Sequence, residues 1–304
     1  LSRIYPNGVD YLDSYSLAES GALASRRPYG AVIDEVTNEV YMSFFFATGI
    51  YIYDESNLLS QGGTGVQSSI ISTTYKYWIQ DAKTRNNGKI EMWGGHPSHA
   101  PRALVRIYYD GAAWQIVDFS AEINSQLGAG TAIGGGRYYV DANGCIWAML
   151  SGGGNCSILK GTLTPATDPN VPSNWTFVSI LEKAATGDTD GDGQNWNANW
   201  ANLGFLYPYE DLGGGADPKF YIADYYNQKL KELKHNGGTS PTVSLNWSIS
   251  TPSWGVVPLK PSIIIHLDGN TWLVFFITGA KLLDVSTGVM TELFVSGASY
   301  RTKY

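Results

Sequence analysis

The sequence has little charge, few cysteines and no long apolar run. Only 15% of its 304 residues are Asp, Glu, Lys or Arg, and the formal net charge is −7. No cluster of Lys or Arg stands out, which argues against a nucleic-acid partner, because phosphate binding needs a concentrated basic surface. No apolar run approaches the roughly 18 residues of a membrane span. We therefore expect neither nucleic-acid binding nor a membrane-spanning segment.

Sequence motifs of common enzymes are also missing. No Gly-x-Ser-x-Gly nucleophile elbow occurs, and no convincing set of Ser, His and Asp can be assembled. The glycine triplets at 134–136 and 152–154 are not followed by the Gly-Lys-Ser/Thr of a phosphate-binding loop, so they indicate turns. These absences favour a protein that is not an enzyme.

Aromatic residues and glycine are plentiful, and they follow a repeat. Five times an apolar strand reaches a turn rich in Asp, Asn and Gly and continues into a second strand with a large aromatic residue, and most copies are followed by a third and a fourth strand. A four-stranded unit that recurs at about fifty residues is typical of a β-propeller blade. The five copies of the first two strands span residues 31–45, 79–93, 139–150, 209–224 and 264–276.

The spacing of equivalent positions supports the repeat. The gaps between successive positions are 50, 56, 74 and 51 residues, and the long gap contains an insertion at 181–203. We predict an all-β fold: a single propeller domain over residues 1–304, built of four-stranded antiparallel blades. The equivalent positions are Tyr41, Glu91, Trp147, Tyr221 and Trp272.

The N-terminus resembles the second half of a blade. Residues 3–11 align without gaps on residues 106–114, and Glu19 then falls on Glu122, two blades further on. The chain is thus expected to begin at the third strand of a blade, with five complete blades after the partial blade at 1–27. Either this half completes a sixth blade, or sequence upstream of it has been removed.

The two cysteines leave two alternatives open. Cys145 and Cys156 are expected on the second and third strands of one blade. A tight turn centred between Leu150 and Ser151 would bring them within disulfide reach, whereas a turn centred on the following glycines would stagger them by about four residues.

One acidic loop has the spacing of a calcium site. In the insertion, Asp188, Asp190 and Asp192 alternate and are followed by glycine, so their carboxylates can converge on a hard cation. The spacing resembles the calcium loop of EF-hand and dockerin-like proteins, which implies Gln194 as a carbonyl ligand and places Asn199 where those loops carry a bidentate glutamate. A solvated acidic turn is the alternative.

Long loops are expected at one end of the blades. Connections from the second to the third strand, and from the fourth strand to the next blade, leave the same end, and loops on a rigid β scaffold often carry the binding function. Their aromatic side chains could contact a glycan or a protein. For Trp196 and Trp200, the alternative is that they only hold the insertion to the scaffold. For His96 and His99, the alternative is that they bind a metal. The candidate ligand-binding residues are Trp196, Trp200, Tyr225, Tyr226, His96, His99 and Arg102.

A recurring aspartate has a simpler interpretation. Asp34, Asp141 and Asp268 each stand just before the turn between the first two strands of a blade. An Asp side chain at this place can accept hydrogen bonds from the backbone of its own turn. We therefore predict a role in turn formation for these residues.

About four blades resemble those of a known superfamily. YYVDANGCIWAML, FYIADYYNQKLKELKHNG and LDGNTWLVFFITGAKLLDVSTG are similar to the blades of NHL-repeat and gluconolactonase-like propellers. For the lactonases of that group, the resemblance implies a catalytic calcium in the central channel. The acidic residue of their first blade would fall at Arg27–Ala31, where this chain has none, but Asp224 remains a candidate channel ligand.

Two functions from different classes follow. The first is a secreted or surface-exposed binding, adhesion or structural module that contacts a glycan or a protein. A larger extracellular or viral assembly is one setting in which such a module would act. This function is favoured by the low charge and by the aromatic polar loops. It implies an extracellular or cell- or virion-surface location, which three glycosylation sequons also favour, at Asn155, Asn174 and Asn246. The second is a calcium-dependent hydrolase or lactonase with its site in the central channel.

Overall fold

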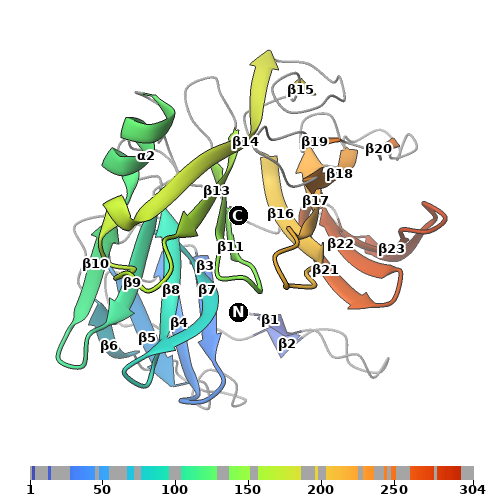
Figure 1. The fold of residues 1–304 in the computed structure, drawn as a ribbon. Helices are drawn as coiled ribbons and strands as arrows, with labels where there is room; N and C mark the ends of the chain where they lie inside the picture. The colour runs from blue at the N-terminus through green and yellow to red at the C-terminus, as the bar shows by residue number, and fades with distance from the viewer. Residues whose placement is uncertain are drawn as a thin grey trace. The chain divides into compact units, whose positions relative to one another are not determined.

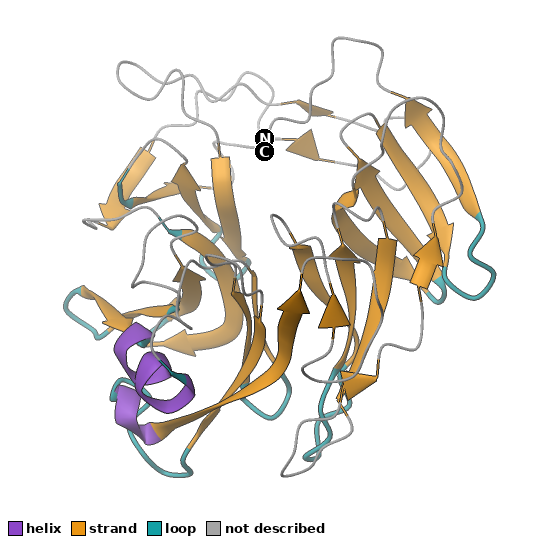
Figure 2. Ribbon diagram, turned by 90° about the horizontal axis from the view of Figure 1, so that it is seen from above, coloured by secondary structure: helices purple, strands orange, loops and turns teal. Residues whose placement is uncertain are grey.

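Most of the residues placed by the structure lie in β-strands. Figure 2 shows these strands in orange. The computed structural model describes residues 2–3, 13–14, 28–44, 48–54, 67–71, 77–95, 104–128, 137–150, 157–185, 196–197, 203–224, 229–235, 243–244, 248–250, 261–276 and 279–295.

The chain divides into two compact units. The first comprises Leu1–Trp93, Arg106–Ile116 and Tyr304, and the second comprises Gly94–Val105 and Val117–Lys303.

The first unit holds a strand pair, one four-stranded sheet and most of another. The pair consists of β1 (Ser2–Arg3) and β2 (Asp13–Ser14), which are antiparallel. The first sheet consists of β3 (Pro28–Asp34), β4 (Glu39–Phe44), β5 (Ile50–Asp54) and β6 (Gln67–Ile71). The second sheet consists of β7 (Trp78–Asn86), β8 (Lys89–Gly95), β9 (Val105–Tyr109) and β10 (Trp114–Asp118).

The second unit holds three more sheets, which Figure 1 shows in green to red. One consists of β11 (Arg137–Val140), β12 (Ile146–Leu150), β13 (Ser157–Leu163), β14 (Trp175–Ala185) and β15 (Trp196–Asn197). The next consists of β16 (Leu203–Glu210), β17 (Lys219–Asp224), β18 (Lys229–His235), β19 (Val243–Ser244) and β20 (Ser248–Ser250). The last consists of β21 (Pro261–Asp268), β22 (Thr271–Phe276), β23 (Gly279–Asp284) and β24 (Met290–Val295).

The order of the strands is that of propeller blades. In each larger sheet, the first four strands lie side by side in chain order. The first strand of one sheet contacts the first strand of the next within each unit: β3 contacts β7, β11 contacts β16, and β16 contacts β21. Repeated four-stranded sheets that adjoin through their first strands make a β-propeller, so the predicted fold class is confirmed.

The equivalent aromatic positions of the repeat pack between neighbouring blades. Tyr41, Trp147 and Trp272 are each at most 2% exposed. Edge-on and tilted ring contacts of this kind add specific packing energy to the burial of apolar area. The ring pairs are Tyr41–Trp114, Trp147–Phe220 and Tyr221–Trp272, with centroids 5.6, 5.1 and 4.9 Å apart.

The recurring aspartates form turns, as predicted, at the two positions where the structure shows their bonds. Asp34 Oδ1 accepts the backbone N–H groups of Val36 at 3.0 Å and Thr37 at 3.3 Å. Asp141 Oδ1 accepts the N–H of Asn143 at 2.9 Å. Each carboxylate thus satisfies donors that the tight turn removes from the strand ladder.

Three features differ from the sequence-based expectation. The helix α2 (Ser120–Leu127), purple in Figure 2, follows β10 where only strands were expected. The expected insertion begins inside a strand, because β14 continues to Ala185. A short 3₁₀ helix, η1 (Pro172–Asn174), precedes β14. Neither α2 nor η1 is long and apolar enough to cross a membrane, and no other helix occurs in the described ranges.

The register of β12 and β13 decides between the two cysteine alternatives. Leu150 pairs with Ser157, so the turn between the strands spans 151–156 and includes Cys156, which lies outside the described residues. Cys145 is a free thiol, and its Sγ lies 3.7 Å from Thr162 Oγ1 across the sheet. Burial raises the pKa of this thiol. The disulfide alternative is therefore wrong.

Candidate functional site

The structure describes none of the side chains of the predicted site. Of Trp196 only the backbone is described, in β15. The other predicted ligand-binding and metal residues outside the described ranges are His96, His99, Arg102, Asp188, Asp190, Asp192, Gln194, Asn199, Trp200, Tyr225 and Tyr226.

The described backbone brings two of the predicted loops to one end of the blade formed by β16 to β20. Leu203 pairs with Asp224, and Asp224 pairs with Lys229, so the start of β16 lies beside the turn from β17 to β18. Trp200 and Tyr225 lie outside the described residues; in the sequence, Trp200 stands three positions before Leu203 and Tyr225 directly after Asp224.

The insertion returns to the sheet from which it leaves. β15 pairs in parallel with the end of β14, with Trp196 opposite Lys183 and Asn197 opposite Ala185. Parallel neighbours need a connection that carries the chain back along the first strand before the second strand begins. The acidic residues 188–192 belong to this connection.

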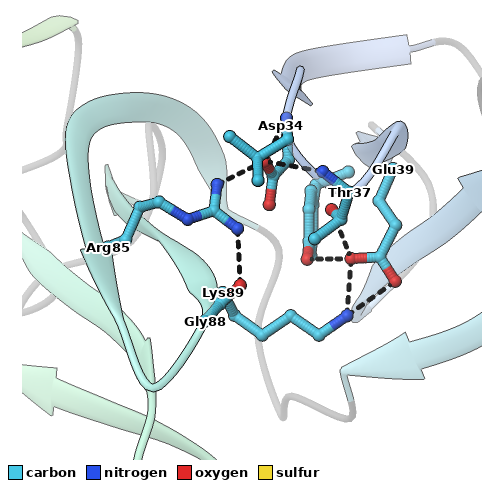
Figure 3. A network of polar contacts seen from close by, with 8 residues as sticks. Asp34, Thr37, Glu39, Arg85, Gly88 and Lys89 are labelled. Atoms are coloured by element: carbon cyan, nitrogen blue, oxygen red, sulfur yellow. Dashed lines mark hydrogen bonds and ion pairs between the residues drawn. The ribbon is translucent and has the colours of Figure 1, made fainter.

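The opposite end of the blades carries charged side chains that link neighbours. In the first unit, the Arg85 guanidinium pairs with Asp34 Oδ1 of the preceding blade and also donates to the Gly88 carbonyl. Lys89 Nζ lies 2.8 and 2.7 Å from the two carboxylate oxygens of Glu39. Figure 3 shows that these residues form one network between the turns of two blades.

The network holds its acids in the ionised form. Burial alone would raise the pKa of Asp34, but hydrogen bonds from Arg85, Thr37 and the turn amides outweigh it and lower the pKa to about 2. Glu39 is affected in the same way: burial opposes ionisation, but Lys89 and Tyr41 lower its pKa. Burial and the hydrogen bond to Glu39 raise the pKa of Tyr41, so this phenol stays protonated.

A second network links the blades that begin with β11 and β16. The Tyr139 hydroxyl donates to Asp211 Oδ2 at 2.6 Å, and the Ala142 amide donates to the same oxygen at 2.8 Å. Asn143 donates to the Ala216 carbonyl at 2.8 Å and accepts the Gly215 amide at 2.9 Å. One turn is thereby bonded to the next through both side-chain and backbone groups.

A lysine and a tryptophan extend this second network into the core. Trp147 Nε1 donates to Asp141 Oδ2 at 2.8 Å, and Lys160 Nζ lies 5.5 Å from the centroid of the Trp147 ring. Lys160 also pairs with Asp217 of the next blade. Burial would lower the pKa of Lys160, but Asp217 outweighs it and raises the pKa. The cation thus lies between a carboxylate and an aromatic face, an arrangement that stabilises a partly buried charge.

One blade carries an ion pair where the others have an aromatic residue. Glu91 occupies the repeat position of Tyr41 and Trp147; it is 8% exposed, and Arg106 is 4% exposed. Arg106 Nε donates to Glu91 Oε1 at 2.7 Å, and its Nη2 donates to the other carboxylate oxygen. The guanidinium also lies 4.7 Å from the centroid of the Tyr108 ring. This bidentate pairing satisfies two charges that would be costly if buried alone.

The chemistry of these described clusters is that of structural links. Their carboxylates accept bonds from Arg, Lys, Tyr or turn amides, as the distances above show, and such pairing fixes neighbouring turns. Within the described ranges, no three His, Cys, Asp or Glu side chains lie close enough to hold a metal ion. Sequence reasoning missed the two networks, although Glu39 and Lys89 have opposite charge and stand 50 residues apart, one repeat length.

The link between Asp34 and Arg85 predicts a dependence of stability on pH. The pKa of Asp34 falls from 3.8 to about 2 in the folded protein. Its contribution to the free energy of unfolding is therefore complete above about pH 4 and is lost as the pH falls towards 2. The loss is on the order of 2 kcal/mol. Urea unfolding at pH 7 and at pH 3 should show Asp34→Asn to be less stable at pH 7 and less sensitive to acid than wild type.

The exposed neighbour Glu35 provides the control for this measurement. Glu35→Gln removes a carboxylate from the same turn and leaves the pairing of Asp34 with Arg85 in place, so it should keep the stability at pH 7 that Asp34→Asn loses. If Asp34→Asn and wild type lose the same free energy between pH 7 and pH 3, the pairing with Arg85 does not stabilise the fold.

Structural comparisons agree with the propeller fold. A chain of a nidogen/laminin complex has a TM-score of 0.55 and 11% identity, covering 96% of this chain and 86% of that one. Virginiamycin B lyase from Staphylococcus aureus has a TM-score of 0.51 and 15% identity, covering 90% and 72%. PorZ, a surface component of the type-IX secretion system of Porphyromonas gingivalis, has a TM-score of 0.51 and 12% identity, covering 88% and 33%.

Sequence comparison adds no closer relationship. The chain matches no protein-family model and no curated protein sequence. At identities of 11–15%, the structural likeness shows the fold and not the activity. The chain is therefore a β-propeller.

Proposed function

We propose that this propeller is a binding module at an extracellular or cell or virion surface, and that it contacts a glycan or a protein through loops at one end of its blades. The observation that carries the proposal is the pairing of Leu203 with Asp224 and of Asp224 with Lys229. From it we infer that Trp200, three positions before Leu203, and Tyr225 and Tyr226, directly after Asp224, lie near one another. The fold neighbours from a nidogen/laminin complex and a bacterial surface component support a recognition role.

The residue types suit recognition. Tyrosine and tryptophan offer flat apolar faces to sugar rings or to peptide side chains, and their polar groups add directional hydrogen bonds. Both are enriched at the energetic centres of protein interfaces. At the opposite end of the blades, by contrast, the described turns are bonded to one another by the networks of Asp34 and Asp211. The loop end is therefore the better candidate for contact with a partner.

The first test of this proposal is the effect of removing the loop aromatics. Trp200→Ala and Tyr226→Ala should each weaken binding to the best glycan of a defined oligosaccharide array by about tenfold, because stacking on an aromatic face contributes on the order of 1 kcal/mol. The matched control is Leu212→Ala. Leu212 is 79% exposed in the turn between β16 and β17, at the other end of the same blade.

We expect the three variants to keep the wild-type far-ultraviolet circular dichroism, because side chains in loops contribute little to the packing between strands. Equal weakening by Leu212→Ala, or no weakening by either loop variant, would contradict a glycan site at the loop end. Protein partners would then be tested on the same variants.

We further propose that calcium orders the insertion and takes no part in chemistry. Three carboxylates at alternate positions, from Asp188, Asp190 and Asp192, with the Gln194 carbonyl, form an oxygen donor set that suits a hard cation of calcium size. Asn199 would contribute one neutral oxygen where a glutamate would contribute two, so the affinity should be modest. The pairing of β15 with β14 on either side of this loop is consistent with an ordered insertion.

Calcium should then raise the melting temperature of the wild-type protein, because a ligand that binds only the folded state stabilises it by mass action. At a concentration one hundred times the dissociation constant, the gain is about 2.7 kcal/mol. Asp190→Ala should abolish this response, whereas Glu35→Gln should retain it. A calcium response that persists in Asp190→Ala would show that the loop is not the site.

The second candidate function is a calcium-dependent hydrolase or lactonase with its site in the central channel. Its support is the fold likeness to an enzyme, virginiamycin B lyase. Asp224, at the end of β17, is the acid whose substitution tests it.

A further inference from the structure

The helix α2 lies along the outer edge of β14. It contacts β14, and the fully buried Phe119, just before the helix, packs against the rings of Trp175 and Phe177 at centroid distances of 5.7 and 6.2 Å. Ile123 is also buried. Asp118 Oδ1 accepts the Ser120 amide at 2.8 Å and thereby fixes the start of the helix. The helix is thus anchored to the strand through its first turn.

One side chain of the helix bonds to the backbone of the strand as another strand would. Gln126 Nε2 donates to the Trp175 carbonyl at 2.8 Å, and Gln126 Oε1 accepts the Phe177 amide at 2.7 Å. A residue of a parallel strand makes the same two bonds. Its N–H donates to one carbonyl of the neighbouring strand, and its C=O accepts the amide two positions further along that strand. The carboxamide of Gln126 therefore replaces one residue of a parallel strand.

A neighbouring acid fixes the orientation of this amide. Glu122 Oε1 accepts Gln126 Nε2 at 2.8 Å, one helical turn away. Because Glu122 can only accept when ionised, it selects the amide orientation that presents the nitrogen to Trp175 and the oxygen to Phe177. The arrangement matches both a donor and an acceptor of the strand edge.

The same edge of β14 also pairs with another strand of this chain. β13 lies on one side of β14, and β15 pairs in parallel on the other side, at Lys183 and Ala185. Backbone groups at a free sheet edge readily pair with strands of other molecules, which makes such an edge a site of self-association. The pairing with β15 shows that a segment of this sequence fits the edge.

We propose that Gln126 guards the edge of β14 against a strand from a second copy of this chain. With the carboxamide in place, the Trp175 carbonyl and the Phe177 amide are satisfied within the molecule. Without it, the last turn of α2 loses this hold on β14 and can move off the edge, and the two groups become available to a strand of a second copy. This role concerns a different surface from the loop end and does not depend on the proposed function.

The test compares Gln126→Ala with Gln126→Lys and with Ser125→Ala, an exposed neighbour on the same helix. Hydrogen exchange of the Phe177 amide should be about tenfold faster in both Gln126 variants, because its hydrogen bond is lost. Light scattering should show a mass that exceeds the wild-type mass and rises with concentration for Gln126→Ala only. A lysine at a sheet edge opposes strand addition, so Gln126→Lys should keep the wild-type mass.

Two outcomes would overturn the proposal. Unchanged exchange at Phe177 in Gln126→Ala would show that the amide does not protect the edge. Faster exchange with the wild-type mass at every concentration would show that the opened edge does not pair. If Gln126→Ala is insoluble, Gln126→Lys decides: a soluble variant of wild-type mass supports guarding of the edge, and equal insolubility contradicts it.

Discussion

Replacing Arg106 with methionine is expected to lower the free energy of unfolding by about 3–5 kcal/mol. Glu91 is 8% exposed, and its carboxylate is paired with the guanidinium through both of its oxygens. Methionine retains much of the length of the side chain but removes the charge, so Glu91 would remain buried without a counter-charge. Urea unfolding at pH 7 measures the loss.

The double variant Arg106→Met with Glu91→Gln distinguishes the ion pair from packing. Removing the second charge should recover much of the loss, because an uncompensated buried carboxylate is the costly state. A single variant that loses less than about 1 kcal/mol would show that this pair behaves as an exposed one. A double variant less stable than the single one would show that packing, not charge, dominates.

Trp147→Ala is expected to have a comparable effect, about 3–5 kcal/mol. The side chain is fully buried, and its ring centroid lies 5.1 Å from that of Phe220 on the next blade. Its removal leaves a cavity between two blades and also deprives Asp141 of the indole donor at 2.8 Å. Thermal and urea unfolding should both report the loss.

Trp147→Phe is the matched control for the cavity. It keeps an aromatic ring at the junction and loses the indole N–H, so the cost should be about 1–2 kcal/mol. If the alanine and phenylalanine variants are equally stable, the ring does not support the junction of the two blades, and the aromatic repeat position has no structural role there.

The blades could be predicted because each of their local signals agrees with the fold. Alternating apolar residues, turn residues and an aromatic at a constant repeat position all point to the same hairpins, and Asp34 and Asp141 form the turns predicted for them. The helix α2 could not be predicted in this way. Its eight residues are only weakly amphipathic, and it is held by contacts of Phe119 and Gln126 with a strand about fifty residues further along.

Charge pairing and register were beyond sequence reasoning for different reasons. Glu91 breaks the aromatic pattern, and only the fold reveals that Arg106 compensates it within the same sheet. The position of Cys145 opposite Thr162 depends on the centre of a glycine-rich turn, which composition does not fix. By contrast, the pair of Glu39 and Lys89 could have been found by searching for opposite charges one repeat apart.

The candidate site stays a prediction, and the sequence could give only its expected location. The topology of a blade assigns the loops after β14 and β17 to one end, and the described strands that flank them pair through Leu203 and Asp224. The identity of the ligand depends on how long polar loops are shaped, and repeat patterns carry no information about that. The loop aromatics and the acidic insertion therefore remain predictions.

The most direct test of recognition, as opposed to turnover, follows the fate of a bound ligand. The best-binding glycan of the oligosaccharide array is incubated with wild type and with Asp224→Asn, with and without calcium, and is then recovered for mass spectrometry. We expect both proteins to bind it and to return it with its mass unchanged. Conversion of the glycan by wild type, lost in Asp224→Asn but retained in Trp200→Ala and Tyr226→Ala, would contradict the binding module and establish an enzyme.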